Sequence, residues 1–172
     1  MSMEDQRKLS AACEGKAVEG AGNYAGGIDG FIVFTQAKPD AGFEYSVDGV
    51  HYKLRDPVKI EEAKTVFCLD AAEQVEEGFC AFETVEGIGV AGVQLVDVSK
   101  SKGPTFPRIS VQRKARLVDP STGETVAEYV HKSAAPKCDQ FVGDPVAENF
   151  RALEPSPISF ADWTLEQLGV PK

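Results

Sequence analysis

The residues best suited to bind a charged partner lie close together, in residues 98–118. No Asp or Glu occurs in this stretch, although the chain has 27 acidic residues and a formal net charge of -9. The stretch holds a third of the 18 Lys and Arg residues of the chain. They are Lys100, Lys102, Arg108, Arg113, Lys114 and Arg116. Because ammonium and guanidinium groups bind carboxylates, the pattern predicts a contact with an acidic protein surface.

A matching acidic segment comes earlier in the chain, in residues 61–86. Only Lys64 opposes its acids, which are Glu61, Glu62, Asp70, Glu73, Glu76, Glu77, Glu83 and Glu86. The simpler interpretation is two solvated faces, or one contact within the chain, since runs of charge are usually surface. The alternative is a contact between subunits that builds a ring or filament. We therefore predict a non-enzymatic binding or structural subunit, a homo-oligomer, whose partner is itself or an acidic protein surface.

Residues that could support catalysis are sparse. The chain has two histidines, His51 and His131, and a metal site would need both of them with a thiolate or carboxylate such as Cys138 or Asp139. Their spacing does not indicate such a site, so no catalytic residue or metal ligand is assigned. The alternative function is a small enzyme or ligand-binding β-barrel with a pocket near His51 or His131, which requires convergent titratable groups.

No cofactor site is predicted. Gly87-Ile-Gly89-Val-Ala-Gly92 matches the pattern G-x-G-x-x-G, but a dinucleotide site needs a helix to begin there. Residues 90–98 favour a strand, so we expect a glycine-rich turn between two strands.

The cysteines form no C-x-x-C pair and are too widely spaced for a zinc ribbon. They are Cys13, Cys68, Cys80 and Cys138. Free, mostly buried thiols are expected in a reducing compartment, and a Cys68–Cys80 bridge is the alternative in an oxidising one.

Composition narrows the class of protein. A length of 172 residues suits a single domain, residues 1–172. The sequence pI near 4.8 argues against nucleic acid and anionic membranes as partners. No apolar run is long enough to span a bilayer, and the polar N-terminus lacks an apolar signal core. We expect a cytoplasmic or otherwise non-secreted protein.

Two segments have clear local signals. In residues 43–54 a turn at Asp48-Gly49 predicts a β-hairpin in which every apolar residue lies on one face. Its predicted pairs are Val47 with Val50, Ser46 with His51, Tyr45 with Tyr52, Glu44 with Lys53 and Phe43 with Leu54. The apolar run Phe31–Phe34 does not alternate, which indicates a strand covered on both faces.

The remaining elements follow in order. Residues 1–27 are expected to form a helical or flexible N-terminal arm, with a helix at 3–13 and a glycine-rich loop after it. We then expect a strand at 64–69, a helical turn in 70–77, and strands at 79–85 and 90–98. A second hairpin joins 108–118 to 125–131, and a final helix begins at a cap formed by Ser159 and Asp162.

Arg113 is the exception in the second hairpin. It interrupts an alternating apolar face made by Ile109, Val111, Ala115 and Leu117, so it lies either at a rim or at a bulge that re-aims it. Short strands at regular spacing predict a mainly β fold, a small antiparallel sandwich or barrel. Short N- and C-terminal helices would cover its openings or edges. The alternative is an α+β fold with one mid-chain helix near 58–77.

Overall fold

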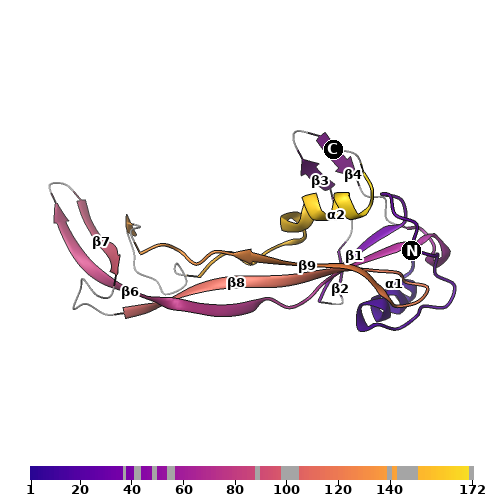
Figure 1. Ribbon diagram of the computed structural model, residues 1–172, viewed down its shortest axis with the longest axis horizontal. Coiled ribbons are helices and arrows are strands. Elements are labelled where there is room, and N and C mark those ends of the chain that lie inside the picture. The colour runs from indigo at the N-terminus through magenta and orange to yellow at the C-terminus, as the bar shows by residue number, and fades with distance from the viewer. Residues whose placement is uncertain are drawn as a thin grey trace. The chain divides into compact units, whose positions relative to one another are not determined.

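The computed structural model describes residues 1–36, 38–40, 44–47, 50–53, 57–87, 90–97, 105–138, 141–142 and 151–170. It confirms a mainly β chain with short helices near both ends (Figure 1). The chain divides into two compact units. Unit 1 comprises Met1–Ala71, Arg113–His131 and Ser156–Lys172, and unit 2 comprises Ala72–Gln112 and Lys132–Pro155. The assignment of a single domain stays a prediction.

Unit 1 is built on an open sheet, so the barrel alternative is not formed there. Its strand order is β2-β1-β5-β8-β9. The strands are β1 Phe31–Thr35, β2 Lys38–Asp40, β5 Thr65–Leu69, β8 Thr105–Val118 and β9 Thr125–Ser133, with the last part of β8 and most of β9 in this unit. β1 runs parallel to β5, whereas β5 and β8 are antiparallel.

Side chains that alternate along these strands bury both faces of the sheet. Phe31 and Val33 pack with Phe67 and Leu69 on one face, where Phe160 and Leu165 join them. The opposite face buries Ile32, Phe34, Val66 and Cys68 against Leu9 and Ala12. The unalternating run Phe31–Phe34 is therefore buried throughout, as predicted.

The terminal helices supply the two outer layers. They are α1 Met3–Ser10, continued by the 3-10 turn η1 Ala11–Glu14, and α2 Ala161–Gln167, preceded by the 3-10 turn η5 Pro157–Phe160. Both cover faces of the sheet, which corrects the expectation that they cover openings or edges. The expected cap at Ser159 is also wrong, because Ser156 caps η5 and α2 follows it directly.

Glycines let the N-terminal loop pack closely on its neighbours. Gly30 has φ +73°, and a Cβ atom there would lie 2.1 Å from the carbonyl oxygen of Glu62. Gly123, in the turn between β8 and β9, has φ +76° and would place a Cβ 2.6 Å from the backbone of Lys16. Only glycine combines a left-handed backbone with so close an approach. The loop thus has a packing role in addition to its bends.

The predicted helical turn in residues 70–77 is wrong, and so is the alternative of a helix near 58–77. The short 3-10 turn η2 Ile60–Glu62 precedes β5, and β6 Glu73–Gly87 follows it as a strand. Glu73, Gln74, Val75 and Glu76 pair with β8. Strand pairing therefore overrides the helix propensity of the Glu-rich segment.

Unit 2 contains β6, the first part of β8, β7 Val90–Asp97 and β10 Phe141–Val142. β6 is antiparallel to both β7 and β8, and β10 is antiparallel to β7. Gly87 pairs with Val90, so the glycine motif joins two strands as predicted; Ile88 and Gly89 lie outside the described residues.

The hairpin of β3 Glu44–Val47 and β4 Val50–Lys53 has the predicted register. Glu44 pairs with Lys53, Tyr45 with Tyr52, Ser46 with His51 and Val47 with Val50. The turn at Asp48-Gly49 and the pair of Phe43 with Leu54 lie outside the described residues. Within the described part of the chain, no helix has the length and apolar character needed to cross a membrane.

Candidate functional site

The predicted basic surface is only partly described, and its described members make contacts within the chain. Lys100 and Lys102 lie outside the described residues. In unit 2, Arg108 donates a hydrogen bond from Nε to the carbonyl oxygen of Pro136 at 2.7 Å. In unit 1, Lys114 lies 3.5 Å from Glu128, and both side chains are well exposed. The side chain of Lys114 is therefore more exposed to solvent than those of Arg113 and Arg116.

Arg113 is buried, with only 6% of its surface exposed. Its Nε donates to the carbonyl oxygen of Asp70 at 2.9 Å. The pairing of β5 with β8 ends at Leu69 and Ala115, and β6 resumes the pairing at Glu73 and Gln112. Three residues, 70–72, thus stand opposite two, 113–114, which is the arrangement of a β-bulge. The bulge frees a backbone carbonyl that the buried guanidinium can bind.

Arg116 forms an ion pair with Asp70 at the same bulge. Its Nη2 lies 2.8 Å from Oδ1 of Asp70 and donates to the carbonyl oxygen of Cys13 at 3.0 Å. The backbone N–H of Asp70 donates to the carbonyl oxygen of Lys114. Asp70 belongs to the acidic segment and Arg116 to the basic one, so the two segments meet within one chain at this point.

Other acids of residues 61–86 also have local partners. Glu62 accepts from the backbone N–H of Val58 at 2.9 Å, and Glu73 accepts from Gln112 at 3.0 Å. Glu77 is paired with Lys132 in unit 2. The hydrogen bond from Lys132, followed by one from Ser110, lowers the pKa of Glu77 below its ordinary value. These carboxylates stabilise local structure.

The cysteines form two disulfides, which corrects both expectations drawn from the sequence. Cys13 is joined to Cys68, and Cys80 to Cys138, with Cα–Cα distances of 5.6 and 5.4 Å. No thiol is free. Cys68 and Cys80 belong to different units, and each finds its partner more than fifty residues away in sequence. Spacing alone carries no signal for such pairs.

A cavity of about 350 Å³ in unit 1 opens beside the first disulfide, and we call it the disulfide cavity. It is lined by Cys13, Glu14, Phe34, Gln36, Cys68, Leu69, Asp70, Ala71 and Arg116. Gln36 has φ +50°, the one left-handed backbone of a non-glycine residue in the described part of the chain. Such strained residues cluster at ligand sites and switch regions. The cavity thus joins a disulfide, an ion pair and a strained residue.

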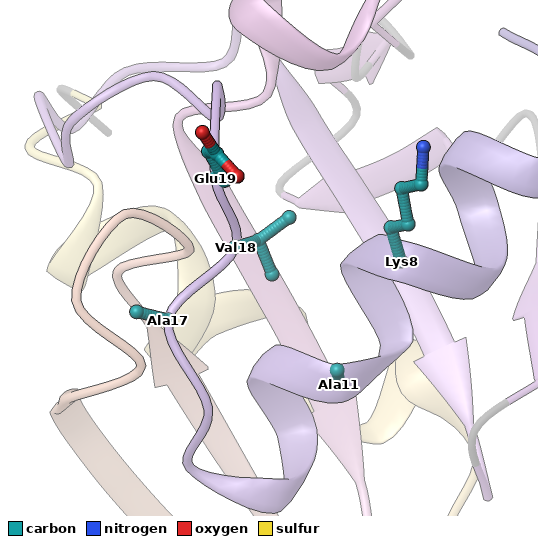
Figure 2. A pocket seen from close by; sticks show the side chains of 5 residues that line it. All are labelled: Lys8, Ala11, Ala17, Val18 and Glu19. Atoms are coloured by element: carbon teal, nitrogen blue, oxygen red, sulfur yellow. The ribbon is translucent and has the colours of Figure 1, made fainter.

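A second cavity, of about 340 Å³, lies between α1 and the loop that follows η1. Figure 2 shows Lys8 on α1, Ala11 at the start of η1, and Ala17, Val18 and Glu19 on the facing loop. Its lining offers one ammonium and one carboxylate, and Lys8 is already 2.9 Å from Glu4. We assign no chemistry to it.

The third feature is the surface of β9. Tyr129 stacks on Trp163 at 5.8 Å between ring centroids, and His131 meets the ring of Phe160 at 5.7 Å. Ala127 packs on the same core, so these three residues of β9 face α2. The alternating residues Val126 and Val130 face the other way and are 46% and 48% exposed.

The structure does not bring the two histidines into a described site. The ring of His131 packs against Phe160, and the side chain of His51 lies outside the described residues. The alternative of a pocket near either one stays a prediction. Within the residues that the structure describes, no three His, Cys, Asp or Glu side chains gather as metal ligands would. Comparison with family models, with curated proteins and with solved structures finds no match to this chain.

Proposed function

We propose that the chain is a non-enzymatic binding subunit that self-associates by pairing β9 with β9 of a second copy. The observation that carries the proposal is the exposed edge of β9. Among the described strands, β9 pairs with β8 alone, and it contains no proline. A nine-residue edge strand with exposed valines is a template for another strand. Proteins that do not use such an edge usually block it with proline, a bulge or inward-pointing charge.

The charge pattern of β9 supports a two-fold antiparallel register centred on Val130. In this register Val130 meets its own copy. Glu128 of each copy lies opposite Lys132 of the other, in addition to the pairs that these residues form with Lys114 and Glu77 of their own chain. Tyr129 lies opposite His131 on the face that packs on α2. Opposite charges and aromatic pairs across neighbouring strands each contribute roughly 0.2 to 1 kcal/mol. The same surface is self-complementary, as a two-fold interface requires.

The sequence predicts a different contact for self-association, between acidic residues 61–86 and basic residues 100–116. This contact has less support than the pairing of β9. Arg108, Arg113 and Arg116 already bind groups of their own chain, and Arg113 and Arg116 are largely buried. Glu128 and Lys132 are also paired within the chain, but 59% and 48% of their side chains stay exposed. Among the described residues, the exposed Lys114 supports this contact between acidic and basic residues; Lys100 and Lys102 lie outside the described residues. It remains a prediction of contact with self or with an acidic protein surface.

Charge exchange on β9 tests the proposal. Sedimentation equilibrium of the wild-type protein at rising concentration is expected to show a monomer–dimer equilibrium. Glu128→Lys alone and Lys132→Glu alone place like charges opposite each other and are expected to weaken the dimer. The double variant Glu128→Lys/Lys132→Glu restores opposite charges and is expected to recover association. Lys137→Glu, an exposed residue outside β9, is the control for net charge.

A wild-type protein that stays monomeric at every concentration overturns the proposal. If a dimer forms but the double variant is as weak as both single variants, the register is wrong. Circular dichroism of each variant shows whether the fold is intact. Association that responds instead to Lys114→Glu, and not to the β9 exchange, favours the contact between acidic and basic residues.

We also propose that the protein works in an oxidising compartment. The cytoplasmic or otherwise non-secreted setting was expected from the lack of an apolar signal core, and free thiols were expected to follow from it, whereas all four cysteines are paired. Disulfides form and persist chiefly in secretory, periplasmic or extracellular environments. Quantifying free thiols in protein isolated from its native cell tests this proposal, and four free thiols would contradict it.

A further inference from the structure

The two cysteines that line the disulfide cavity, Cys13 and Cys68, differ in their exposure. Cys68, in the buried core of the sheet, is only 2% exposed. Cys13, at the end of η1, is partly exposed and lies in the wall of the cavity. A small molecule in the cavity therefore reaches the disulfide from the side of Cys13. Since exchange requires in-line access to one sulfur, this geometry selects which sulfur is attacked.

A positive charge lies beside the other sulfur. Cys68 and Arg116 are direct partners in the antiparallel pair of β5 and β8, so their side chains project to the same face about 5 Å apart at Cβ. The guanidinium of Arg116 also binds the carbonyl of Cys13 at 3.0 Å. A neighbouring cation stabilises a thiolate and makes it a better leaving group. The charge is thus placed to receive a thiolate on Cys68.

We propose that Cys13–Cys68 is an exchangeable disulfide, opened by a small thiol that enters the disulfide cavity. The thiolate of that molecule attacks Sγ of Cys13 and forms a mixed disulfide with it. The bond between Cys13 and Cys68 breaks, and Sγ of Cys68 leaves as a thiolate beside Arg116. A second molecule of thiol attacks the mixed disulfide, which releases Cys13 as a thiol and yields the oxidised disulfide of the small thiol. The protein gains two electrons and the two small thiols lose them.

The second disulfide provides a comparison within the same chain. Cys13–Cys68 and Cys80–Cys138 span 55 and 58 residues, so loop closure makes them almost equally hard to open. Their surroundings differ. Each disulfide joins a buried cysteine, Cys68 or Cys80, to a partly exposed one, but the strand partners of Cys80 are Asp97 and Phe106. Neither residue type carries the positive charge that stabilises a thiolate. Cys80–Cys138 should therefore resist the same reagent.

The test uses reduced glutathione as the probe and the folded full-length chain. Aliquots are quenched with an alkylating agent at set times, and mass spectrometry of the peptides quantifies each cysteine. The expected first product carries glutathione on Cys13 and the alkylating agent on Cys68, with Cys80–Cys138 intact. Glutathione found first on Cys80 or Cys138, or on Cys68 in place of Cys13, overturns the proposal.

Variants of the charges separate electrostatic assistance from loss of structure. Arg116→Met is expected to slow the reaction at Cys13 roughly tenfold, and Arg116→Lys, which keeps the charge, to recover part of that rate. Lys114→Met is the matched control, because it removes a cation of β8 that does not line the cavity. Asp70→Asn removes the carboxylate that shares the guanidinium and is expected to speed the reaction. A substitution that merely loosens the fold would make the disulfide react faster with glutathione. An Arg116→Met variant that reacts at an unchanged or higher rate therefore contradicts the proposal that Arg116 assists the exchange.

Discussion

Arg116 on β8 lies directly opposite Cys68 on β5. Its side chain reaches two further points of the chain, the carboxylate of Asp70 at 2.8 Å and the carbonyl of Cys13 at 3.0 Å. One guanidinium therefore connects the N-terminal turn, the bulge after β5 and the strand β8. The disulfide from Cys68 to Cys13 connects two of the same elements covalently. Charge and covalent bond act together to hold η1 on the sheet.

Removal of either disulfide should therefore lower stability by a similar amount. Loops of 55 and 58 residues give a loss of about 4 kcal/mol in the chain-entropy model. We expect this loss for Cys13→Ala/Cys68→Ala and for Cys80→Ala/Cys138→Ala, measured by urea unfolding. A double variant as stable as the wild type would contradict the role of that disulfide.

Phe160 should be one of the most sensitive core positions. It is buried, and its ring meets those of Phe67, Tyr129 and His131 at centroid distances of 6.1, 6.1 and 5.7 Å. Phe160→Ala is expected to cost about 3 to 5 kcal/mol in the free energy of unfolding. Ile158 lies in the same turn but is 62% exposed, so Ile158→Ala should change stability by about 0.5 kcal/mol or less. Equal effects in urea unfolding would show that α2 does not dock on the sheet.

Two glycines of one loop separate backbone strain from steric clash. Gly27 has φ +76°, and a Cβ atom there would meet nothing described within 4 Å, whereas Gly30 has φ +73° and faces the carbonyl of Glu62. Gly27→Ala should cost about 1 to 2 kcal/mol from its left-handed backbone alone. Gly30→Ala carries that cost and must also displace the backbone of residue 62, so it should be clearly less stable. Thermal or urea unfolding of both variants measures the difference, which vanishes if the loop does not pack on η2.

Local patterns allowed part of this fold to be predicted from the sequence. The hairpin from Glu44 to Lys53 is specified by its turn and its alternation, and the buried strand Phe31–Phe34 by its unbroken apolar run. Helices near both ends follow from short amphipathic segments. In each case the deciding interactions lie within a few residues of one another.

The parts that could not be predicted depend on distant residues. Glu73–Glu76 favours a helix locally, yet it becomes a strand because β8 offers it a partner. Arg113 breaks an apolar pattern, and its ligand is a carbonyl that only the bulge at Asp70 exposes. The partner of Cys68 lies before the glycine-rich loop, so neither disulfide follows from spacing. The disulfide cavity was missed for the same reason, although the charge pattern did select Arg116.

The ion pair of Glu77 with Lys132 makes a prediction about pH. Hydrogen bonds from Lys132 and Ser110, with the charge of Arg108 as a smaller cause, lower the pKa of Glu77 from its ordinary value of 4.5. A lowered pKa in the folded state means that the unfolded state binds the proton more readily. The stabilisation from Glu77 is therefore complete above about pH 4.5 and is lost as the pH falls through the lower, folded pKa.

Lys132→Met should raise the pKa of Glu77 in an NMR titration of its side-chain carboxyl, because the largest cause of the shift is removed. It should not restore the ordinary value, since Ser110 and Arg108 still lower the pKa. The stability difference between wild type and Lys132→Met should shrink as the pH falls below 4.5. Lys137→Met removes the same charge from an exposed position of unit 2 and should leave the titration of Glu77 almost unchanged. If both variants move the pKa equally, the shift reflects net charge, and the contact between Lys132 and Glu77 does not govern it.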